Sequence, residues 1–284
     1  MKTRMLGNTD LEVSTIGFGA WAIGGGNWEY GWGHQDDDDS IKAIHEALDT
    51  GINWIDTAAV YGLGRSEEVV AKALKGIRRE VIIATKFGII WNEQRDLSRH
   101  LKAASIRREV EESLKRLRTD YIDLYQMHWP DPDEDIEEGW SVMEELVTAG
   151  KVRNVGVSNF TVSQLERINA IYPVASLQPP YNMFNRKIER DILPYCSQHH
   201  LGVVSYSPLQ NGLLTGKFTK ELLDTLPDDD FRKDKNPQFQ PPRFELNLKT
   251  VAALQLVAQH VGRTIAQLAI AWVLRSPEVT SAIV

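Results

Sequence analysis

Four polar residues could together deliver a proton to a substrate: Asp56, Tyr61, Lys86 and His128. Three of them stand at the carboxyl end of a short strand-like run, and Tyr61 lies in the loop that follows Asp56. The three runs cover residues 53–56, 81–86 and 122–128. If the ends of these runs meet in the fold, they bring together a phenol, an ammonium, a carboxylate and an imidazole. Such a group can donate a proton, which the reduction of a carbonyl requires.

The lysine and the aspartate are expected to tune the tyrosine. One interpretation is that Asp56 and Lys86 form an ion pair with a structural role alone. However, desolvation offsets much of the attraction within a buried pair, so such a pair adds little stability. Their position at the ends of adjacent strands, beside a tyrosine, favours catalysis. We expect the Lys86 ammonium to lower the pKa of Tyr61 from about 10 while Asp56 holds the lysine in place. His128 can then hydrogen-bond the same substrate oxygen, although a lone histidine in a strand is usually structural.

Short apolar runs alternate with longer amphipathic segments along the chain, and this series must position the four residues. The expected strands are 16–19, 53–56, 81–86, 122–128, 152–158, 175–178, 202–206 and 280–284. The expected helices are 40–50, 66–74, 105–117, 136–149, 162–170, 187–199 and 264–276, with Ser105 preceding the third of them. Eight βα units with buried strands predict an α/β fold, the (β/α)8 TIM barrel, and an open doubly wound sheet is the alternative.

Other segments complete the expected domain, which spans residues 1–284 as a single barrel. The turn at 7–10 predicts an N-terminal β-hairpin that plugs the bottom of the barrel. Residues 207–249 predict a long loop after strand seven, of the kind that forms a lid or a binding loop. The sequence stops at Val284, so we expect it to be truncated after strand eight, with the C-terminal segment missing.

Composition narrows the class of protein. The chain has 284 residues, of which 42% are hydrophobic, so it can bury a large core. Its net charge of −7 argues against nucleic-acid partners and anionic membrane surfaces. There is one cysteine, Cys196, which we interpret as a packed residue rather than a nucleophile. Without a signal peptide or a membrane span, we expect a cytoplasmic protein.

Two motifs are better explained by local structure than by ligands. Residues 17–22 fit a G-x-G-x-x-G/A pattern, but a dinucleotide site would need a helix to open there, and a loop of aromatic residues follows instead. Residues 36–39 are four aspartates, which are expected to begin a helix because acidic groups favour a helix N-terminus. No histidine-rich metal motif occurs in the sequence, so we expect no catalytic metal.

More polar residues end the later strands. Such residues could simply satisfy backbone groups at the rim, but together they offer amide, hydroxyl and aromatic partners for a nicotinamide ring. The following loop, 210–217, adds glycines for close backbone approach and a cation for a pyrophosphate. The strand-end residues in question are Ser158, Asn159, Gln178, Tyr206, Ser207 and Pro208.

With these residues in place, the chain resembles the aldo-keto reductases, and most of all the bacterial branch related to potassium-channel β-subunits. The similar stretches extend over nearly the whole chain. They are 11–21 (LEVSTIGFGAW), 51–64 (GINWIDTAAVYGLG), 84–88 (ATKFG), 121–130 (YIDLYQMHWP), 151–160 (KVRNVGVSNF), 178–182 (QPPYN) and 206–217 (YSPLQNGLLTGK).

The resemblance implies an NADPH-dependent carbonyl reductase with Tyr61 as general acid, Lys86 and Asp56 as its tuning pair, and His128 as the orienter of the carbonyl. It implies that Tyr206 stacks on the nicotinamide, and that Ser158, Asn159 and Gln178 hold its carboxamide. The other implied cofactor residues are Trp21, Asp56, Ser207, Pro208, Leu209, Gln210, Gly212, Lys217 and Arg232.

The substrate is expected to be a small aldehyde or ketone in a pocket walled by Trp21, Trp91 and Trp129. In the family, the segment that binds the adenosine 2′-phosphate follows strand eight. The sequence stops at Val284, before that segment, so NADH is not excluded as the cofactor. The resemblance to channel β-subunits leaves open an alternative, a nucleotide-sensing or partner-binding barrel with slow catalysis. A barrel hydrolase that uses Asp56 with another carboxylate would give Lys86 and Tyr61 no role.

Overall fold

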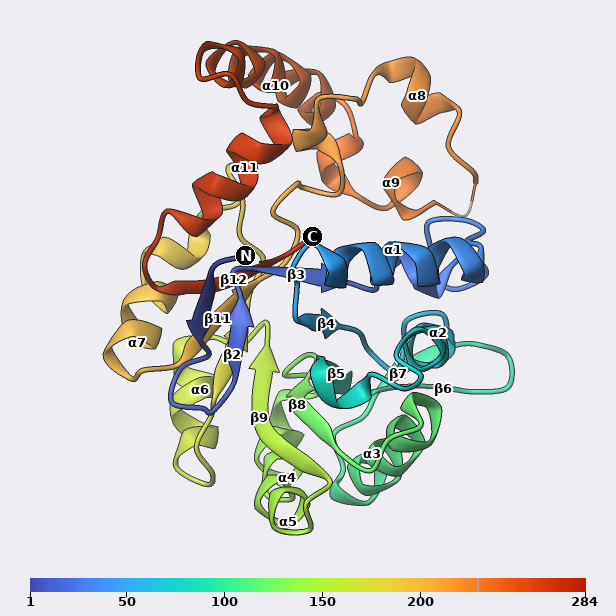
Figure 1. Cartoon of the computed structure of the whole chain (residues 1–284), viewed down its shortest axis with the longest axis vertical. Helices are drawn as coiled ribbons and strands as arrows, with labels where there is room; N and C mark the ends of the chain where they lie inside the picture. The colour runs from blue at the N-terminus through green and yellow to red at the C-terminus, as the bar shows by residue number, and fades with distance from the viewer. Residues whose placement is uncertain (229) are drawn as a thin grey trace.

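Eight parallel strands close into a barrel in the computed structural model, which describes residues 1–228 and 230–284 (Figure 1). Each strand pairs with the next one along the chain, and the last pairs with the first. This confirms the predicted (β/α)8 barrel. The strands are β3 (Ile16–Gly19), β4 (Trp54–Asp56), β5 (Ile82–Phe87), β8 (Ile122–Met127), β9 (Val152–Ser158), β10 (Ser176–Gln178), β11 (Gly202–Ser205) and β12 (Val279–Ile283).

The register of the strands brings the predicted polar residues to the same level of the barrel. Lys86 on β5 lies directly opposite Gln126 on β8. Gln178 on β10 lies opposite Ser158 on β9, and Asp56 on β4 lies opposite Ala84, two positions before Lys86. Since parallel strands share one direction, their carboxyl ends meet at one mouth, where barrels of this class carry their sites.

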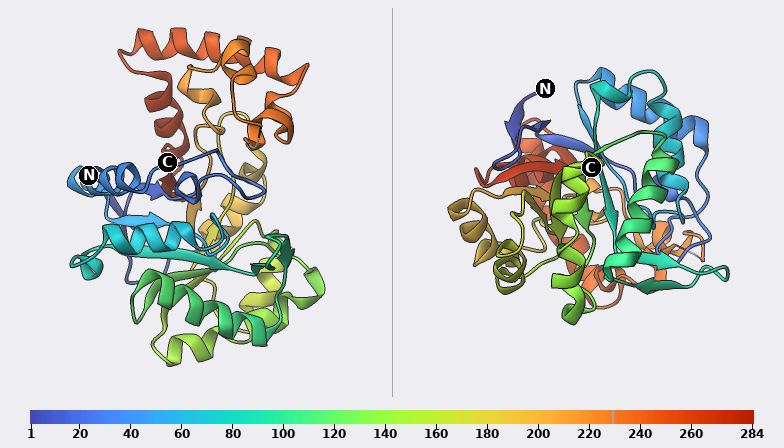
Figure 2. Two further views of the ribbon diagram at one scale, coloured as in Figure 1. Left: turned by 90° about the vertical axis from the view of Figure 1, so that its right-hand side faces the viewer. Right: turned by 90° about the horizontal axis from the view of Figure 1, so that it is seen from below.

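The helices cover the outside of the barrel, with bounds close to those predicted (Figures 1 and 2). Two expected helices are interrupted: 136–149 divides at residues 141–142, and 187–199 begins as a short 3-10 turn. Ser105 is inside its helix, which begins at Ala103. The covering helices are α1 (Asp37–Asp49), α2 (Arg65–Ala73), α3 (Ala103–Leu117), α4 (Ile136–Trp140), α5 (Met143–Thr148), α6 (Val162–Asn169), α7 (Ile192–Gln198) and α11 (Ile265–Leu274).

The N-terminal hairpin closes the end of the barrel opposite the mouth, as predicted. It is formed by β1 (Thr3–Met5) and β2 (Glu12–Ser14). Leu6, Leu11 and Val13 are buried in one cluster with barrel residues that include Trp54 and Leu124. The barrel interior is therefore a packed apolar core beneath the polar mouth.

Both sequence motifs with a local explanation behave as expected. The glycine-rich stretch runs from β3 into a short 3-10 helix, η1 (Ala22–Gly24), and the next α-helix in the described chain begins only at Asp37. Asp36 caps that helix by accepting a hydrogen bond from the Asp39 amide at 3.0 Å. The four aspartates 36–39 therefore place their acidic groups at the N-terminus of the helix, where negative charge is favourable.

Three features were not predicted. A hairpin of β6 (Ile89–Trp91) and β7 (Leu97–Arg99) follows β5 at the mouth. The expected loop after β11 contains short helices, α8 (Lys220–Asp224) and α9 (Phe231–Asp234), and the long helix α10 (Arg243–His260) starts inside it. The apolar residues of α10 occupy both its buried and its exposed faces, and Leu256 is 68% exposed, so its sequence lacks the one-sided periodicity that marks a helix. The helices α8, α9 and α10 lie beyond one side of the barrel (Figure 1, orange and red).

Candidate active site

The Lys86 ammonium contacts Asp56 and Tyr61, two of the predicted catalytic residues, at the barrel mouth. Its Nζ donates hydrogen bonds to Asp56 Oδ1 at 2.5 Å, to the Thr57 carbonyl at 2.9 Å and to the Tyr61 hydroxyl at 3.1 Å. Lys86 is only 1% exposed, because β5 carries it inside the mouth. Three acceptors therefore fix its three donors, and the ammonium is directed at the phenol.

Two glutamines hold the second oxygen of the Asp56 carboxylate. Gln178 Nε2 donates to Oδ2 at 2.7 Å, and Gln126 Nε2 donates to the same atom at 3.3 Å. Gln126 was not among the predicted site residues. The signal for it was available, since it lies on β8 two positions before His128, which directly follows that strand, and opposite Lys86.

Burial and the neighbouring groups act in opposite directions on the pKa of Lys86. Burial would lower the pKa of Lys86, but the attraction of Asp56 and its contact with Tyr61 raise it above the usual value. Lys86 therefore stays an ammonium. For Tyr61 the expected lowering was wrong: burial raises the pKa of its phenol above 10.0, and the opposing effect of Lys86 is smaller. Tyr61 is then neutral at physiological pH, which is the form that donates a proton.

His128 faces the same phenol. The rings of Tyr61 and His128 lie 5.7 Å apart and are nearly perpendicular, at 75°. Burial, with contributions from Lys86 and Arg99, lowers the pKa of the imidazole well below 6.5. His128 is therefore neutral at pH 7 and can donate one hydrogen bond to a substrate oxygen.

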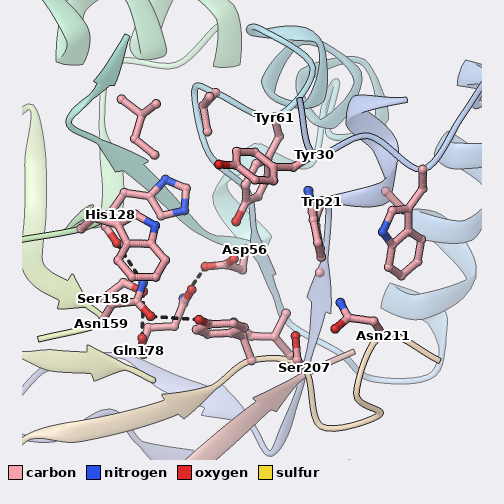
Figure 3. Close-up of a pocket in the computed structure, with 18 of the residues that line it drawn as sticks. Trp21, Tyr30, Asp56, Tyr61, His128, Ser158, Asn159, Gln178, Ser207 and Asn211 are labelled. Atoms are coloured by element: carbon pink, nitrogen blue, oxygen red, sulfur yellow. Dashed lines mark hydrogen bonds between the residues drawn. The ribbon is translucent and has the colours of Figure 1, made fainter. Parts of the chain in front are cut away.

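An amide and hydroxyl cluster continues the mouth beyond β8. Asn159 Nδ2 donates to the His128 carbonyl at 3.1 Å and to Ser158 Oγ at 3.0 Å, and its Oδ1 accepts from the Tyr206 hydroxyl at 2.9 Å. Ser158 Oγ donates to the Gln178 carbonyl at 2.8 Å. These side chains hold one another in place, and Figure 3 shows Ser158, Asn159 and Gln178 near Asp56 in the pocket.

The loop after β11 has a strained backbone. Ser207, Gln210 and Asn211 have φ angles of 54°, 47° and 54°, and Gly212 follows at 98°. Asn182 Nδ2 stabilises this turn by donating to the Ser207 carbonyl at 2.9 Å and to Gln210 Oε1 at 2.6 Å. The sequence marked Asn182 only as the last residue of the stretch 178–182, and the structure gives it this positioning contact. Such strain is typical of backbone that approaches a ligand.

A cavity of about 780 Å³ opens between these groups. Lys86 lies behind its wall. Trp91, Gln210, Lys217 and Arg232 do not line it, and Trp91 instead stands 5.7 Å from the Arg116 guanidinium. The predicted residues that line it are Trp21, Asp56, Tyr61, His128, Trp129, Ser158, Asn159, Gln178, Tyr206, Ser207, Pro208, Leu209 and Gly212 (Figure 3).

The loop after β3 supplies an aromatic wall that the sequence had not assigned to the pocket. Trp28, Tyr30 and Trp32 line the cavity together with Trp21. The Trp21 ring lies 5.4 Å from the Trp32 ring. Aromatic rings at this spacing give a wide apolar surface with favourable edge contacts.

The same loop also packs directly against α9. The Trp21 ring lies 5.1 Å from the ring of Phe231. The Arg232 guanidinium stacks 4.3 Å from the centre of Trp32, and Arg232 Nε donates to Asp230 Oδ1 at 2.9 Å. The long segment after β11 is therefore held against the first loop, over the end of the cavity next to Gly212.

Neither a metal-binding cluster nor a membrane-spanning helix occurs among the described residues. No group of three or more His, Cys, Asp or Glu side chains there is placed to hold a metal ion. In the same residues, every helix is too short or too polar to cross a bilayer. Cys196 is buried, which raises the pKa of its thiol to about 12 and makes it a poor nucleophile.

Comparison with known proteins identifies relatives over almost the whole chain. A model of the aldo/keto reductase family matches residues 15–284. The aldo-keto reductase YhdN of Bacillus subtilis is 47% identical over 280 residues, which cover 98% of this chain and 82% of YhdN. The NADH-specific methylglyoxal reductase of Escherichia coli is 36% identical over 295 residues, covering 99% of this chain and 88% of that protein.

Two further matches bear on the branch and the fold. A probable voltage-gated potassium channel subunit beta from Arabidopsis thaliana is 34% identical over 297 residues, covering 100% of this chain and 86% of the subunit, which is consistent with the expected relationship. The structure of the glycerol dehydrogenase AKR11B4 from Gluconobacter oxydans superposes with a TM-score of 0.88 at 42% identity. That match covers 99% of this chain and 85% of the other.

Proposed function

The chain belongs to the aldo/keto reductase family, and we propose that it reduces an aldehyde or ketone to an alcohol with NADPH as cofactor. The family and the fold support a carbonyl oxidoreductase. One observation carries the finer proposal: the Lys86 ammonium touches both Asp56 and the Tyr61 hydroxyl at the floor of the cavity.

In this proposal Tyr61 is the general acid. Its neutral phenol donates a proton to the substrate oxygen as negative charge develops there. The Lys86 ammonium stabilises the phenolate that remains, and Asp56 keeps the ammonium in place. Neutral His128, across the same space, hydrogen-bonds the carbonyl oxygen and orients it.

The residues around the cavity fit a nicotinamide cofactor, which supplies the hydride when bound. Gln178 Oε1 accepts no hydrogen bond from the described residues, so it remains available to a carboxamide N–H. Ser158 and Asn159 present further polar atoms next to it. Tyr206 lines the same part of the cavity and offers an aromatic face.

The phosphates are proposed to follow the strained loop from Ser207 to Gly212. A Cβ at Gly212 would stand 2.9 Å from the Phe218 ring, so only glycine leaves this close backbone free. Trp32 Nε1 is buried at the cavity wall without a partner among the described residues, and it can donate to a cofactor oxygen there. Arg232 does not line the cavity and is proposed to contribute indirectly, by stacking on Trp32.

The choice between NADPH and NADH is a separate proposal. One relative is by its name NADH-specific, so membership of the family alone does not select NADPH. Separate titrations with NADPH and with NADH, monitored by tryptophan fluorescence, measure which cofactor binds more tightly. The expected result is tighter binding of NADPH. We further propose that the chain acts as a single cytoplasmic domain on small carbonyl substrates.

Replacement of Tyr61 by phenylalanine tests the chemistry. We expect Tyr61→Phe to lower turnover of an aldehyde by orders of magnitude, measured as loss of NADPH absorbance, while cofactor binding persists. Tyr125→Phe is the matched control, because the Tyr125 hydroxyl is buried without a partner in the described residues and lies outside the cavity wall. Near-normal reduction by Tyr61→Phe would reject the mechanism.

A nucleotide-sensing role is the second candidate, supported by the similarity to the Arabidopsis channel subunit. It predicts that the protein binds NADPH tightly but turns over a broad aldehyde panel very slowly. The catalytic proposal predicts appreciable steady-state turnover with at least one aldehyde in the same panel. Steady-state turnover of the aldehyde panel therefore distinguishes the two proposals.

A further inference from the structure

The hairpin of β6 and β7 brings one arginine into the cavity wall. β5 turns at Gly88, whose amide donates to Glu109 Oε2 at 2.8 Å, and the chain then enters β6. In the hairpin Ile89 lies opposite Arg99. Ile89, Leu97 and Arg99 all line the cavity that holds Tyr61 and His128.

Among the described residues of this wall, Arg99 is the only one with a permanent positive charge. Lys86 lies behind the wall and is fully engaged by its three acceptors. The other charged residues of the wall are Asp56, which is paired with Lys86, and Glu29 on the loop after β3. A ligand in the cavity therefore meets a single cation, close to the catalytic histidine.

The Arg99 guanidinium is held in place but keeps free donors. Its Nη1 forms an ion pair with Asp131, and the group stands 5.1 Å from the centre of the Trp129 ring. Trp129 directly follows His128 and also lines the cavity. Nε and Nη2 donate no hydrogen bond within the described part of the chain. A planar guanidinium with free N–H groups on two nitrogens matches the two oxygens of a carboxylate.

The charge of Arg99 also reaches the reacting end of the cavity. It contributes to the low pKa of His128, after burial and Lys86. The ion pair with Asp131 does not remove this influence. As a purely structural contact the pair would matter little, since both side chains are well exposed, at 42% and 50%.

We propose that Arg99 is a specificity-determining residue that selects carbonyl substrates bearing a carboxylate. The aldehyde oxygen lies between Tyr61 and His128, and the carboxylate accepts hydrogen bonds from the free guanidinium nitrogens. The aromatic residues, among them Trp21 and Trp129, contact the apolar part between the two ends. This inference rests on the proposed reductase function and names the substrate class of the same site.

A matched pair of aldehydes tests the proposal. 4-Carboxybenzaldehyde and its uncharged methyl ester, methyl 4-formylbenzoate, present the same reacting group. In the wild type, kcat/KM should be higher for the acid than for the ester. Arg99→Gln should lower kcat/KM for the acid about tenfold or more, because a charge-assisted hydrogen bond is lost. The ester should change less than twofold in the same variant.

Two further variants separate recognition from general effects. Arg99→Lys keeps the charge but loses the fork, so it should restore only part of the preference. Arg95→Gln removes the same charge from the exposed turn of the same hairpin, outside the cavity wall, and should leave the preference unchanged. Equal losses for acid and ester in Arg99→Gln would overturn the proposal.

Binding distinguishes this inference from the proposed function. Tryptophan fluorescence measures the affinity for both aldehydes whether or not they are reduced. If neither aldehyde is turned over but Arg99→Gln still weakens binding of the acid alone, the reductase function fails and Arg99 recognition stands. If the ester is reduced and both compounds bind equally to wild type and Arg99→Gln, the function stands and the inference is rejected.

Discussion

The Lys86 ammonium donates a hydrogen bond to the Tyr61 hydroxyl at 3.1 Å, from a position that solvent barely reaches. A cation beside a phenol stabilises the phenolate after proton transfer, whereas burial favours the neutral phenol before it. The two effects together suit an acid that must hold its proton until a substrate oxygen needs it. Four consequences of this and neighbouring contacts can be measured.

Removal of the lysine should impair both chemistry and stability. Lys86→Met leaves the buried Asp56 carboxylate without its cation, and such a loss costs about 3–5 kcal/mol of unfolding free energy. Turnover should fall by orders of magnitude. The double variant Asp56→Asn/Lys86→Met should regain much of the stability in urea unfolding but none of the activity. Recovery of activity in the double variant would contradict the role of Lys86.

The pH dependence of reduction should follow Tyr61. Burial raises the pKa of the phenol above 10.0, so the acid is protonated at every lower pH. We expect kcat/KM for aldehyde reduction to stay level from neutral to mildly alkaline pH and to fall only above pH 10.0. The measurement is a pH profile with a neutral aldehyde. A fall centred near pH 8 would mean that Lys86 outweighs burial.

His128 should make the protein less stable in acid. The pKa of the imidazole is lowered well below 6.5 in the folded protein, so below pH 6.5 the unfolded chain binds more protons than the folded one. Stability is thus complete above pH 6.5 and is lost as the pH falls, by up to about 1.4 kcal/mol per pH unit.

Urea unfolding at several pH values between 5 and 7.5 measures this loss, which His128→Gln should reduce. His34→Gln serves as the control, since His34 is an exposed histidine outside the cavity wall. Equal acid sensitivity in the wild type and in His128→Gln would show that other groups control it.

Gly212 should control cofactor binding through its close backbone. Alanine at this position would meet both a positive φ of 98° and the Phe218 ring at 2.9 Å. We expect Gly212→Ala to weaken NADPH binding about tenfold or more in a fluorescence titration. Gly150→Ala is the matched control, because Gly150 has a φ of 71° and nothing within 4 Å of an added Cβ. That variant should lose stability but keep its affinity for NADPH.

The barrel could be predicted from the sequence because each strand is a short apolar run with a clear boundary. The meeting of Asp56, Tyr61, Lys86 and His128 could be predicted too, since polar side chains at the carboxyl ends of parallel strands must meet at one mouth. The helix α10 and the β6–β7 hairpin could not, because apolar and polar residues are mixed around all sides of α10 and the hairpin strands have three residues each. Arg99, which that hairpin carries, therefore remained outside the predicted site.

The sequence by itself thus determined the order of the strands, the family and which polar residues meet at the mouth of the barrel. Only the tertiary structure decided which aromatic residues wall the cavity, with Trp28 and Trp32 inside it and Trp91 outside. It also decided the direction of the Tyr61 pKa, which was expected to fall and instead rises. The physical reason is common to both. Exposure and desolvation depend on everything that packs around a side chain, and those neighbours are distant in the sequence.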